Sequence, residues 1–157
     1  TSFCQTDNAA FKTAVEEYID QGCKTNSACD IGATYGYPIG KWCTSSITSM
    51  SGLFSEKDTF NDDISTWDTS KVTNMAFMFY GASAFNQAVG SWDTSKVTDM
   101  YGMFYDASAF NQDLCQWRSA FPYNNAGFIF ANSGCANQAT PVSTNGGENW
   151  CSVTTCN

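Results

Sequence analysis

The chain has 157 residues, which is long enough for one domain with a buried core. Hydrophobic residues make up 43% of it and charged residues 14%, a balance that excludes a disordered acidic tail. Seven basic residues against fifteen acidic ones give a net charge of −8, which disfavours nucleic acid and anionic membrane surfaces as partners. No apolar run approaches the ~20 residues of a membrane-spanning helix, so no membrane insertion is expected.

Residues 1–36 are predicted to form an N-terminal cap whose main element is an amphipathic helix at about 8–21. Its apolar stripe, at i, i+4, i+7 and i+8, consists of Phe11, Val15, Tyr18 and Ile19. Gly22 suits the left-handed conformation that often ends a helix. Because a stack of repeats has an open apolar end, we expect this helix to cover it.

Residues 37–118 form a repeat with a fixed period. The stretch WDTSKVTNMAFMFYGASAFNQAV from Trp67 returns as WDTSKVTDMYGMFYDASAFNQDL from Trp92, an offset of 92 − 67 = 25 with no insertion or deletion. A constant period of this size is typical of stacked structural repeats. The repeated apolar columns, which we expect to form the core, are Ile39/Ile64/Val89/Leu114, Trp42/Trp67/Trp92/Trp117, Met50/Met75/Met100, Phe54/Phe79/Phe104 and Phe60/Phe85/Phe110.

Two periodicities alternate within each repeat. Steps of three between apolar residues over 72–85 predict a short helix or 3₁₀ turns. The pattern over 85–92 favours a short strand, although the opposite assignment, with the strand at 72–75, remains open. In either case equivalent strands are expected to stack in parallel.

The repeat degenerates in residues 119–157, which are predicted to hold a last, imperfect repeat and a cysteine-rich C-terminal cap. When the same offset is counted onward, Pro122 and Asn125 fall in apolar columns and Cys135 replaces a phenylalanine. Trp150 is expected to cover the last coil.

The eight cysteines flank the repeats: Cys4, Cys23, Cys29 and Cys43 precede them, and Cys115, Cys135, Cys151 and Cys156 follow. The even number of cysteines at each end predicts disulfides within each end, and disulfides indicate an oxidising compartment. Four cysteines can pair in three ways, so 3 × 3 = 9 of the 105 possible pairings of eight cysteines remain. A zinc site is disfavoured because the chain has no histidine and no CxxC pair, so no metal or other cofactor is expected. The start at Thr1 without a leader is expected of a processed protein that is secreted or on the cell surface.

The pattern FNxxIxxWDTSxVTxMxxMFxxAxxFN resembles the BspA-type leucine-rich repeat, in its methionine- and phenylalanine-rich variant, over roughly residues 36–135. The resemblance implies a repeat solenoid: a short, leucine-rich-repeat-like right-handed coil of short parallel strands and helical or 3₁₀ segments. An N-terminal helical cap and disulfide-pinned ends complete this expected fold. The family is associated with adhesion and recognition outside the cell, and it offers no catalytic residues to carry over.

The sequence contains few of the residue arrangements that enzymes use for catalysis. The absence of histidine removes the usual Ser-His and Cys-His nucleophile arrangements. The adjacent carboxylates of Asp62 and Asp63 would point to opposite faces of an extended segment, which is unsuited to paired acid–base work. With no glycine-rich phosphate loop and no EF-hand pattern either, we expect a protein that is not an enzyme.

An aromatic cluster that the core columns do not need provides the candidate ligand-binding residues, which are Phe77, Tyr80, Tyr101 and Tyr105. Tyrosine rings combine apolar area with a polar tip, which suits the recognition of a protein or a sugar. The alternative is that these rings only roof the neighbouring coil.

Two polar rows are better explained by structure than by ligand binding. The row Asn61, Asn86 and Asn111 is expected to satisfy backbone groups at a bend. The Thr rows are Thr44/Thr69/Thr94 and Thr48/Thr73/Thr98, and capping of turns is favoured for them over contact with ice.

The sequence therefore predicts a non-enzymatic extracellular recognition or adhesion module that binds a protein or glycan through one lateral face. An alternative is a subunit that assembles with itself into an extracellular fibre or coat, since head-to-tail contacts of a repeat module make filaments. A further alternative, based on the Thr rows, is binding to ice or a mineral surface.

Overall fold

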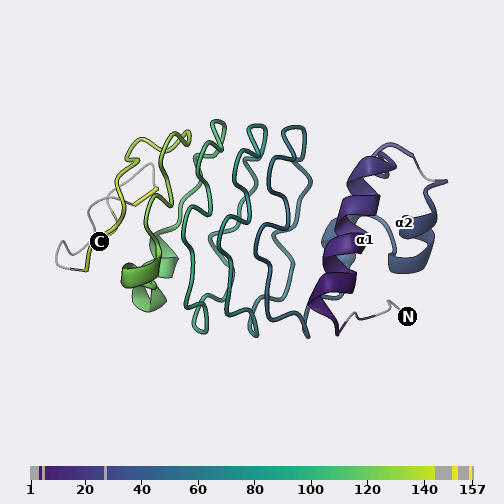
Figure 1. The fold of residues 1–157 in the computed structure, drawn as a ribbon, viewed down its shortest axis with the longest axis horizontal. Coiled ribbons are helices and arrows are strands. Elements are labelled where there is room, and N and C mark those ends of the chain that lie inside the picture. Colours follow the sequence, from purple (N-terminus) through teal and green to yellow (C-terminus); the bar gives the residue numbers. More distant parts are fainter. Residues whose placement is uncertain (1–3, 5, 27, 144–149, 152–155, 157) are drawn as a thin grey trace.

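The computed structural model of the chain describes residues 4, 6–26, 28–143, 150–151 and 156. Its helices are α1 (Asn8–Asp20), α2 (Asp30–Tyr35) and three 3₁₀ helices, η1 (Ile39–Lys41), η2 (Cys115–Ala120) and η3 (Tyr123–Asn125). Coils lie side by side in the middle of the molecule, and we number them 1 (39–63), 2 (64–88), 3 (89–113) and 4 (114–138). Figure 1 shows α1 across one end of this stack, with α2 beyond it, and the C-terminal segment at the other end.

The prediction of a leucine-rich-repeat-like coil of short parallel strands is wrong. The described part of the chain contains no strand and no sheet, and parallel pairing between coils is limited to isolated bridges such as Ser49–Asn74 and Asn74–Asp99. Of the short helix or 3₁₀ turns expected over 72–85, no helix forms; these residues fold into successive turns, several of them closed by a bond from an amide to the carbonyl three positions back.

The backbone hydrogen bonds give the physical reason. Within a coil, alternate residues bond three positions back, as Met78 N does to Met75 O (3.3 Å). The residues between them donate to the next coil, as Phe77 N does to Tyr101 O (2.9 Å). This pattern uses left-handed residues that recur along each coil, and these bend the chain out of the extended geometry of a strand.

The predicted apolar columns do form the core, and every member of them is buried. Their rings stack along the axis of the coils: the centroid of Phe79 lies 5.4 Å from those of both Phe54 and Phe104. Phe79 also stacks at 3.9 Å on Phe85, the ring of the second phenylalanine column in its coil. The stack is therefore held together by two continuous aromatic columns.

Helix α1 closes the first end of the stack. It begins after Asp7, whose side chain accepts a hydrogen bond from Ala10 N (2.7 Å), and its Phe11 ring packs against Trp67 (5.5 Å). The Oδ1 atom of Asn8 accepts hydrogen bonds from the backbone of Thr48 (3.0 Å) and Ser49 (3.3 Å). In coils 2 and 3 the equivalent amides, of Thr73 and Thr98, donate to a carbonyl of the preceding coil. Coil 1 has no preceding coil, so Asn8 supplies the acceptor for the Thr48 amide.

A buried carboxylate also ties the cap to coil 1. Asp62 accepts a hydrogen bond from the Tyr18 hydroxyl (3.0 Å) and pairs with Lys24 (2.7 Å). Burial, together with the negative charge of Asp62, raises the pKa of Tyr18 from 10.0 to about 12. Asp62 therefore anchors the cap to coil 1.

Coil 4 has one extra residue between Trp117 and Ala126, which corrects the alignment expected from a constant period. Phe130, and not Ile129, continues the phenylalanine column by stacking on Phe104 (6.2 Å), an offset of 130 − 104 = 26. Likewise Ala126 is fully buried where a methionine sits in the earlier coils, while Asn125 is exposed. Asn125 is therefore not in an apolar position.

Side chains also close the second end of the stack. The amides of Phe128 and Asn132, which would face a further coil, donate instead to Thr140 Oγ1 (3.1 Å) and Gln138 Oε1 (3.2 Å). Trp150 packs edge-on against the ring of Phe121 (4.7 Å), in line with its expected position over the last coil.

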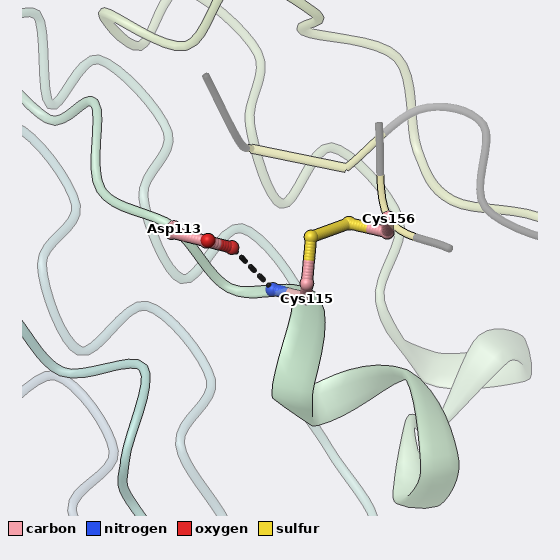
Figure 2. A group of neighbouring side chains, drawn as sticks. All are labelled: Asp113, Cys115 and Cys156. Atoms are coloured by element: carbon pink, nitrogen blue, oxygen red, sulfur yellow. Dashed lines mark hydrogen bonds between the residues drawn. A yellow bond between two sulfur atoms is a disulfide. The ribbon is translucent and has the colours of Figure 1, made fainter. Parts of the chain in front are cut away.

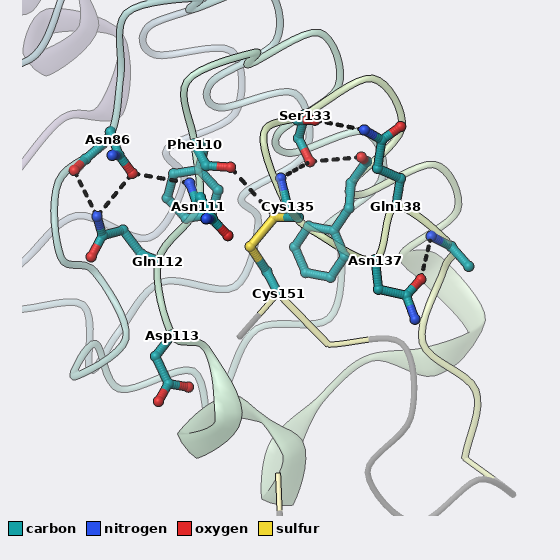
Figure 3. The surroundings of a disulfide bond; sticks show 12 residues. Asn86, Phe110, Asn111, Gln112, Asp113, Ser133, Cys135, Asn137, Gln138 and Cys151 are labelled. Atoms are coloured by element: carbon teal, nitrogen blue, oxygen red, sulfur yellow. Dashed lines mark hydrogen bonds between the residues drawn. A yellow bond between two sulfur atoms is a disulfide. The ribbon is translucent and has the colours of Figure 1, made fainter. Parts of the chain in front are cut away.

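All eight cysteines form disulfides, and the bonds are Cys4–Cys43, Cys23–Cys29, Cys115–Cys156 and Cys135–Cys151. The predicted pairing within each end is confirmed. Figure 3 shows the last of these bonds joining coil 4 to the C-terminal segment beside Phe110. Four disulfides are typical of proteins outside the reducing cytoplasm. In the described part of the chain, no helix has both the length and the apolar character to cross a membrane.

Candidate functional site: an aromatic groove

A hollow of about 300 Å³ on the side of the stack is lined mainly by aromatic residues. We call it the aromatic groove, and its lining residues are Phe77, Tyr80, Tyr101, Gly102, Tyr105 and Phe128. The structure thus brings all four sequence-predicted ligand-binding residues together at one place. Their binding of a ligand stays a prediction.

Three of the rings face solvent to an unusual degree. Phe77 and Tyr101 are each 41% exposed and Phe128 is 57% exposed, whereas every ring of the core columns is buried. Large apolar side chains exposed together are typical of contact surfaces, so this cluster is the candidate binding site.

The backbone under two of these rings is in a conformation that favours glycine. Phe77 has φ 56° and Phe128 has φ 58°, and the same position in coils 1 and 3 is held by Gly52 and Gly102. A bulky residue in the left-handed region costs on the order of 1–3 kcal/mol, and strained residues of this kind cluster at functional sites. The two phenylalanines therefore occupy positions that stability alone would give to glycine.

Glycine in turn makes room for the rings. A Cβ atom at Gly102 would lie 2.9 Å from the Phe77 ring, and one at Gly127 would lie 3.0 Å from the Tyr101 ring. Each of these rings thus lies against a glycine of the next coil, so a side chain at either glycine would push the ring away.

The rings form two rows along the stack. Tyr80 and Tyr105 stack on each other with centroids 5.4 Å apart and an interplanar angle of 14°. In the second row Tyr101 meets Phe77 (5.4 Å) and Phe128 (5.8 Å) edge-on. The tyrosine pair is half-buried, so it both roofs the adjacent coil and forms one wall of the groove.

Phe128 was missed as a site residue because a strictly constant period assigns it to the column of Met103, which is core. The extra position in coil 4 moves it by one, into the exposed column of Phe77. The spacing of the aromatic residues contains the signal, since Phe128-x-Phe130 repeats Phe77-x-Phe79.

The segments that form the groove carry acidic residues and no basic ones. Within the segments that carry it, 74–83, 99–108 and 124–133, the charged residues are Asp99 and Asp106. Asp99 accepts a hydrogen bond from Tyr101 N (3.0 Å), and Asp106 from the side chain of Asn132 (2.8 Å). The lining residues include no cation.

A second cluster, shown in Figure 2, has the residue types of a metal site but not the chemistry. The ligand-type atoms of Asp113, Cys115 and Cys156 lie within 4.8 Å of one another. The two sulfur atoms are bonded to each other, so neither is a thiolate, and the Asp113 carboxylate accepts a hydrogen bond from the Cys115 amide (2.9 Å). This cluster is a turn beside a disulfide.

The asparagine row has the predicted structural role. Asn86 N donates to Asn61 Oδ1 (2.9 Å), and Asn111 N donates to Asn86 Oδ1 (2.9 Å). Figure 3 shows the Nε2 atom of Gln112 donating to the side-chain and backbone oxygens of Asn86, which completes a polar ladder between coils.

The Thr rows bridge coils rather than cap turns, which corrects the expectation for them. Thr44 and Thr69 are buried, and their hydroxyls donate to carbonyls of the next coil. Thr73 and Thr98 are exposed, but each hydroxyl donates to the preceding coil (3.1 Å). The hydroxyl groups of these threonines therefore already donate their hydrogens to carbonyls within the stack.

A family described as "Mycoplasma protein of unknown function, DUF285" matches residues 25–142, which include all four coils. No curated protein matches the chain. No solved structure matches it either.

Proposed function

The chain belongs to the DUF285 family, and we propose that it is a non-enzymatic recognition module, secreted or on the cell surface, that binds a protein or glycan through the aromatic groove. The observation that carries this proposal is the pair of exposed phenylalanines on left-handed backbone. Phe77 and Phe128 incur strain that the glycines of coils 1 and 3 avoid, and a bound partner would offset that strain.

The size and chemistry of the groove support recognition. The exposed rings of Phe77, Tyr101 and Phe128 are of the residue types that suit contact with partners. The four disulfides support a location outside the cytoplasm, where surface and secreted proteins meet such partners.

The closed ends of the stack favour this proposal over self-assembly into a fibre. Asn8 takes up amides at the first end, and Thr140 and Gln138 do so at the second. Head-to-tail stacking would have to displace these side chains. Measuring solution mass against concentration tests the alternative, since continued growth of the assembly would support the fibre subunit.

The proposal is tested with replacements that the repeat itself supplies. Phe77→Gly, Phe128→Gly and Tyr101→Ala each introduce the residue found at the same position of another coil, namely Gly52, Gly102 and Ala76. Val142→Ser is the matched control, because Val142 is 44% exposed and lies outside the groove lining.

Wild-type and variant proteins would be compared on a glycan array and a library of displayed peptides. We expect the triple variant to lose the ligands that the wild type retains, while Val142→Ser keeps them. Unchanged binding by a folded triple variant would refute the groove as the binding site. Normal ice growth with the wild type would remove the ice-binding alternative.

A further inference from the structure

We propose that the partner of the aromatic groove is a basic segment of a protein, whose arginine or lysine side chains lie against the groove's rings. This inference rests on the proposed function and names the ligand class. It favours a cationic peptide over a neutral glycan as the ligand. Binding of a neutral glycan is one of the alternative outcomes of the test below.

The first argument is charge. The chain has a net charge of −8, and the charged residues of the three groove segments are both acidic. Asp106 directly follows Tyr105, and Asp99 is bonded to the amide of Tyr101, so a carboxylate adjoins each row of rings. A partner that contacts these rings meets two carboxylates and no basic residue in the lining.

The second argument is the chemistry of the rings. Five Tyr and Phe side chains surround about 300 Å³, a space suited to a side chain rather than to a folded surface. The face of an aromatic ring is electronegative and attracts a guanidinium or ammonium group placed over it. Arginine also stacks its planar group on such rings, so it meets both features of this groove.

The repeat supplies charge-removing variants with little structural change. In coil 2, Asn74 accepts a hydrogen bond from the amide of Ala76 (2.9 Å) just as Asp99 accepts one from that of Tyr101 (3.0 Å), so Asp99→Asn keeps this turn. Asn132 already occupies the position of Asp106 in coil 4, with φ 55° against 57°, so Asp106→Asn keeps that backbone.

A control pair removes the same charge elsewhere. Asp68 and Asp93 accept hydrogen bonds from the amides of Ser70 and Ser95 in turns outside the groove segments, and an asparagine side chain can accept the same bonds. Asp68→Asn/Asp93→Asn therefore changes the net charge as the groove pair does, and it separates groove binding from attraction to an acidic protein as a whole.

The experiment measures fluorescence anisotropy with a labelled peptide of alternating glycine and arginine, and with the same peptide containing citrulline, the neutral analogue of arginine. We expect the citrulline peptide to bind about two- to fivefold more weakly for each arginine that contacts a ring. The groove pair of Asp→Asn changes should weaken arginine-peptide binding by a similar factor, and the control pair should leave it nearly unchanged.

Tyr101→Ala separates the two proposals. Equal binding of both peptides, with both lost in Tyr101→Ala, would overturn the cationic ligand and leave the recognition groove standing. Equal weakening by the groove and control pairs would overturn it as well, by showing that net charge alone attracts the peptide. If Tyr101→Ala binds the arginine peptide as tightly as the wild type, the cationic ligand is overturned. A neutral glycan that the wild type retains and Tyr101→Ala loses would then identify a glycan as the ligand of the groove, and a variant that loses no ligand of the wild type would overturn the recognition groove as well.

Discussion

Replacing Phe77 by glycine and by alanine separates the strain of its backbone from the packing of its ring. Both changes remove the ring, but only alanine keeps a Cβ atom at φ 56°. The left-handed conformation costs a residue with a Cβ about 1–2 kcal/mol, whereas glycine loses about 0.5–1 kcal/mol more chain entropy than alanine on folding. We therefore expect Phe77→Gly to be more stable than Phe77→Ala by about 0.75 kcal/mol, the difference between the midpoints of these two ranges.

Urea denaturation with the disulfides intact measures this difference as a shift of the midpoint. Ala109→Gly serves as the control, because Ala109 is exposed and is not among the left-handed residues, so glycine there should be destabilising by about 0.5–1 kcal/mol. The reversal of sign between the two positions is the expected result. If Phe77→Ala is as stable as Phe77→Gly or more so, then Phe77 is not strained and the main support for the recognition groove is lost.

Three further predictions concern the caps, the turns and the disulfides. The pKa of Tyr18 is raised from 10.0 to about 12, so its neutral form stabilises the fold below pH 10. The free energy of unfolding, measured by urea titration, should therefore fall between pH 10 and 12. Tyr18→Phe should remove that fall. Hydrogen bonds from serine side chains and amides in their turns lower the pKa values of Asp63, Asp68 and Asp93 from 3.8. Their stabilising effect is therefore present above pH 3.8 and lost as the pH falls through the lowered values, and Asp68→Asn should flatten the acid limb of the same titration. Replacing Cys115 and Cys156 by serine opens a loop with a sequence separation of 41 and should cost up to about 4 kcal/mol, measured as a lower urea midpoint than that of the wild type.

The groove residues could be predicted because the repeat assigns every core position. Once the apolar columns are accounted for, Phe77 and Tyr101 are left over, and a surface is the remaining place for them. The eight cysteines similarly indicated their grouping by their distribution along the chain. In both cases the place of a residue in the sequence repeat determines where that residue lies in the fold.

The backbone conformation of the coils could not be predicted from the repeat in the same way. Steps of three and alternation indicate helix and strand only when all residues of a segment share one conformation. Here hydrogen bonds within a coil and between coils alternate along the chain, and a phenylalanine takes the left-handed conformation of a glycine. Phe77 gives no local sign of that, since its type argues against it. The extra position in coil 4 was hidden for a similar reason, because a degenerate repeat offers few residues against which to align Phe128.

The side-chain closures described above act only on the outermost coils. Residues 64–88 contact their neighbours through bonds that recur between equivalent positions of adjacent coils, as Phe77 N to Tyr101 O and Thr73 N to Thr48 O do. A duplicated copy of this segment, inserted in frame, would leave both closures as they are, because neither end of the stack would change. Its Phe77 would, however, take the place of Gly102 beside the Phe77 ring of the first copy, where a Cβ atom alone would lie 2.9 Å from that ring. The backbone bonds therefore permit the stack to lengthen by whole coils, whereas the alternation of phenylalanine and glycine in the groove restricts which coil can follow which.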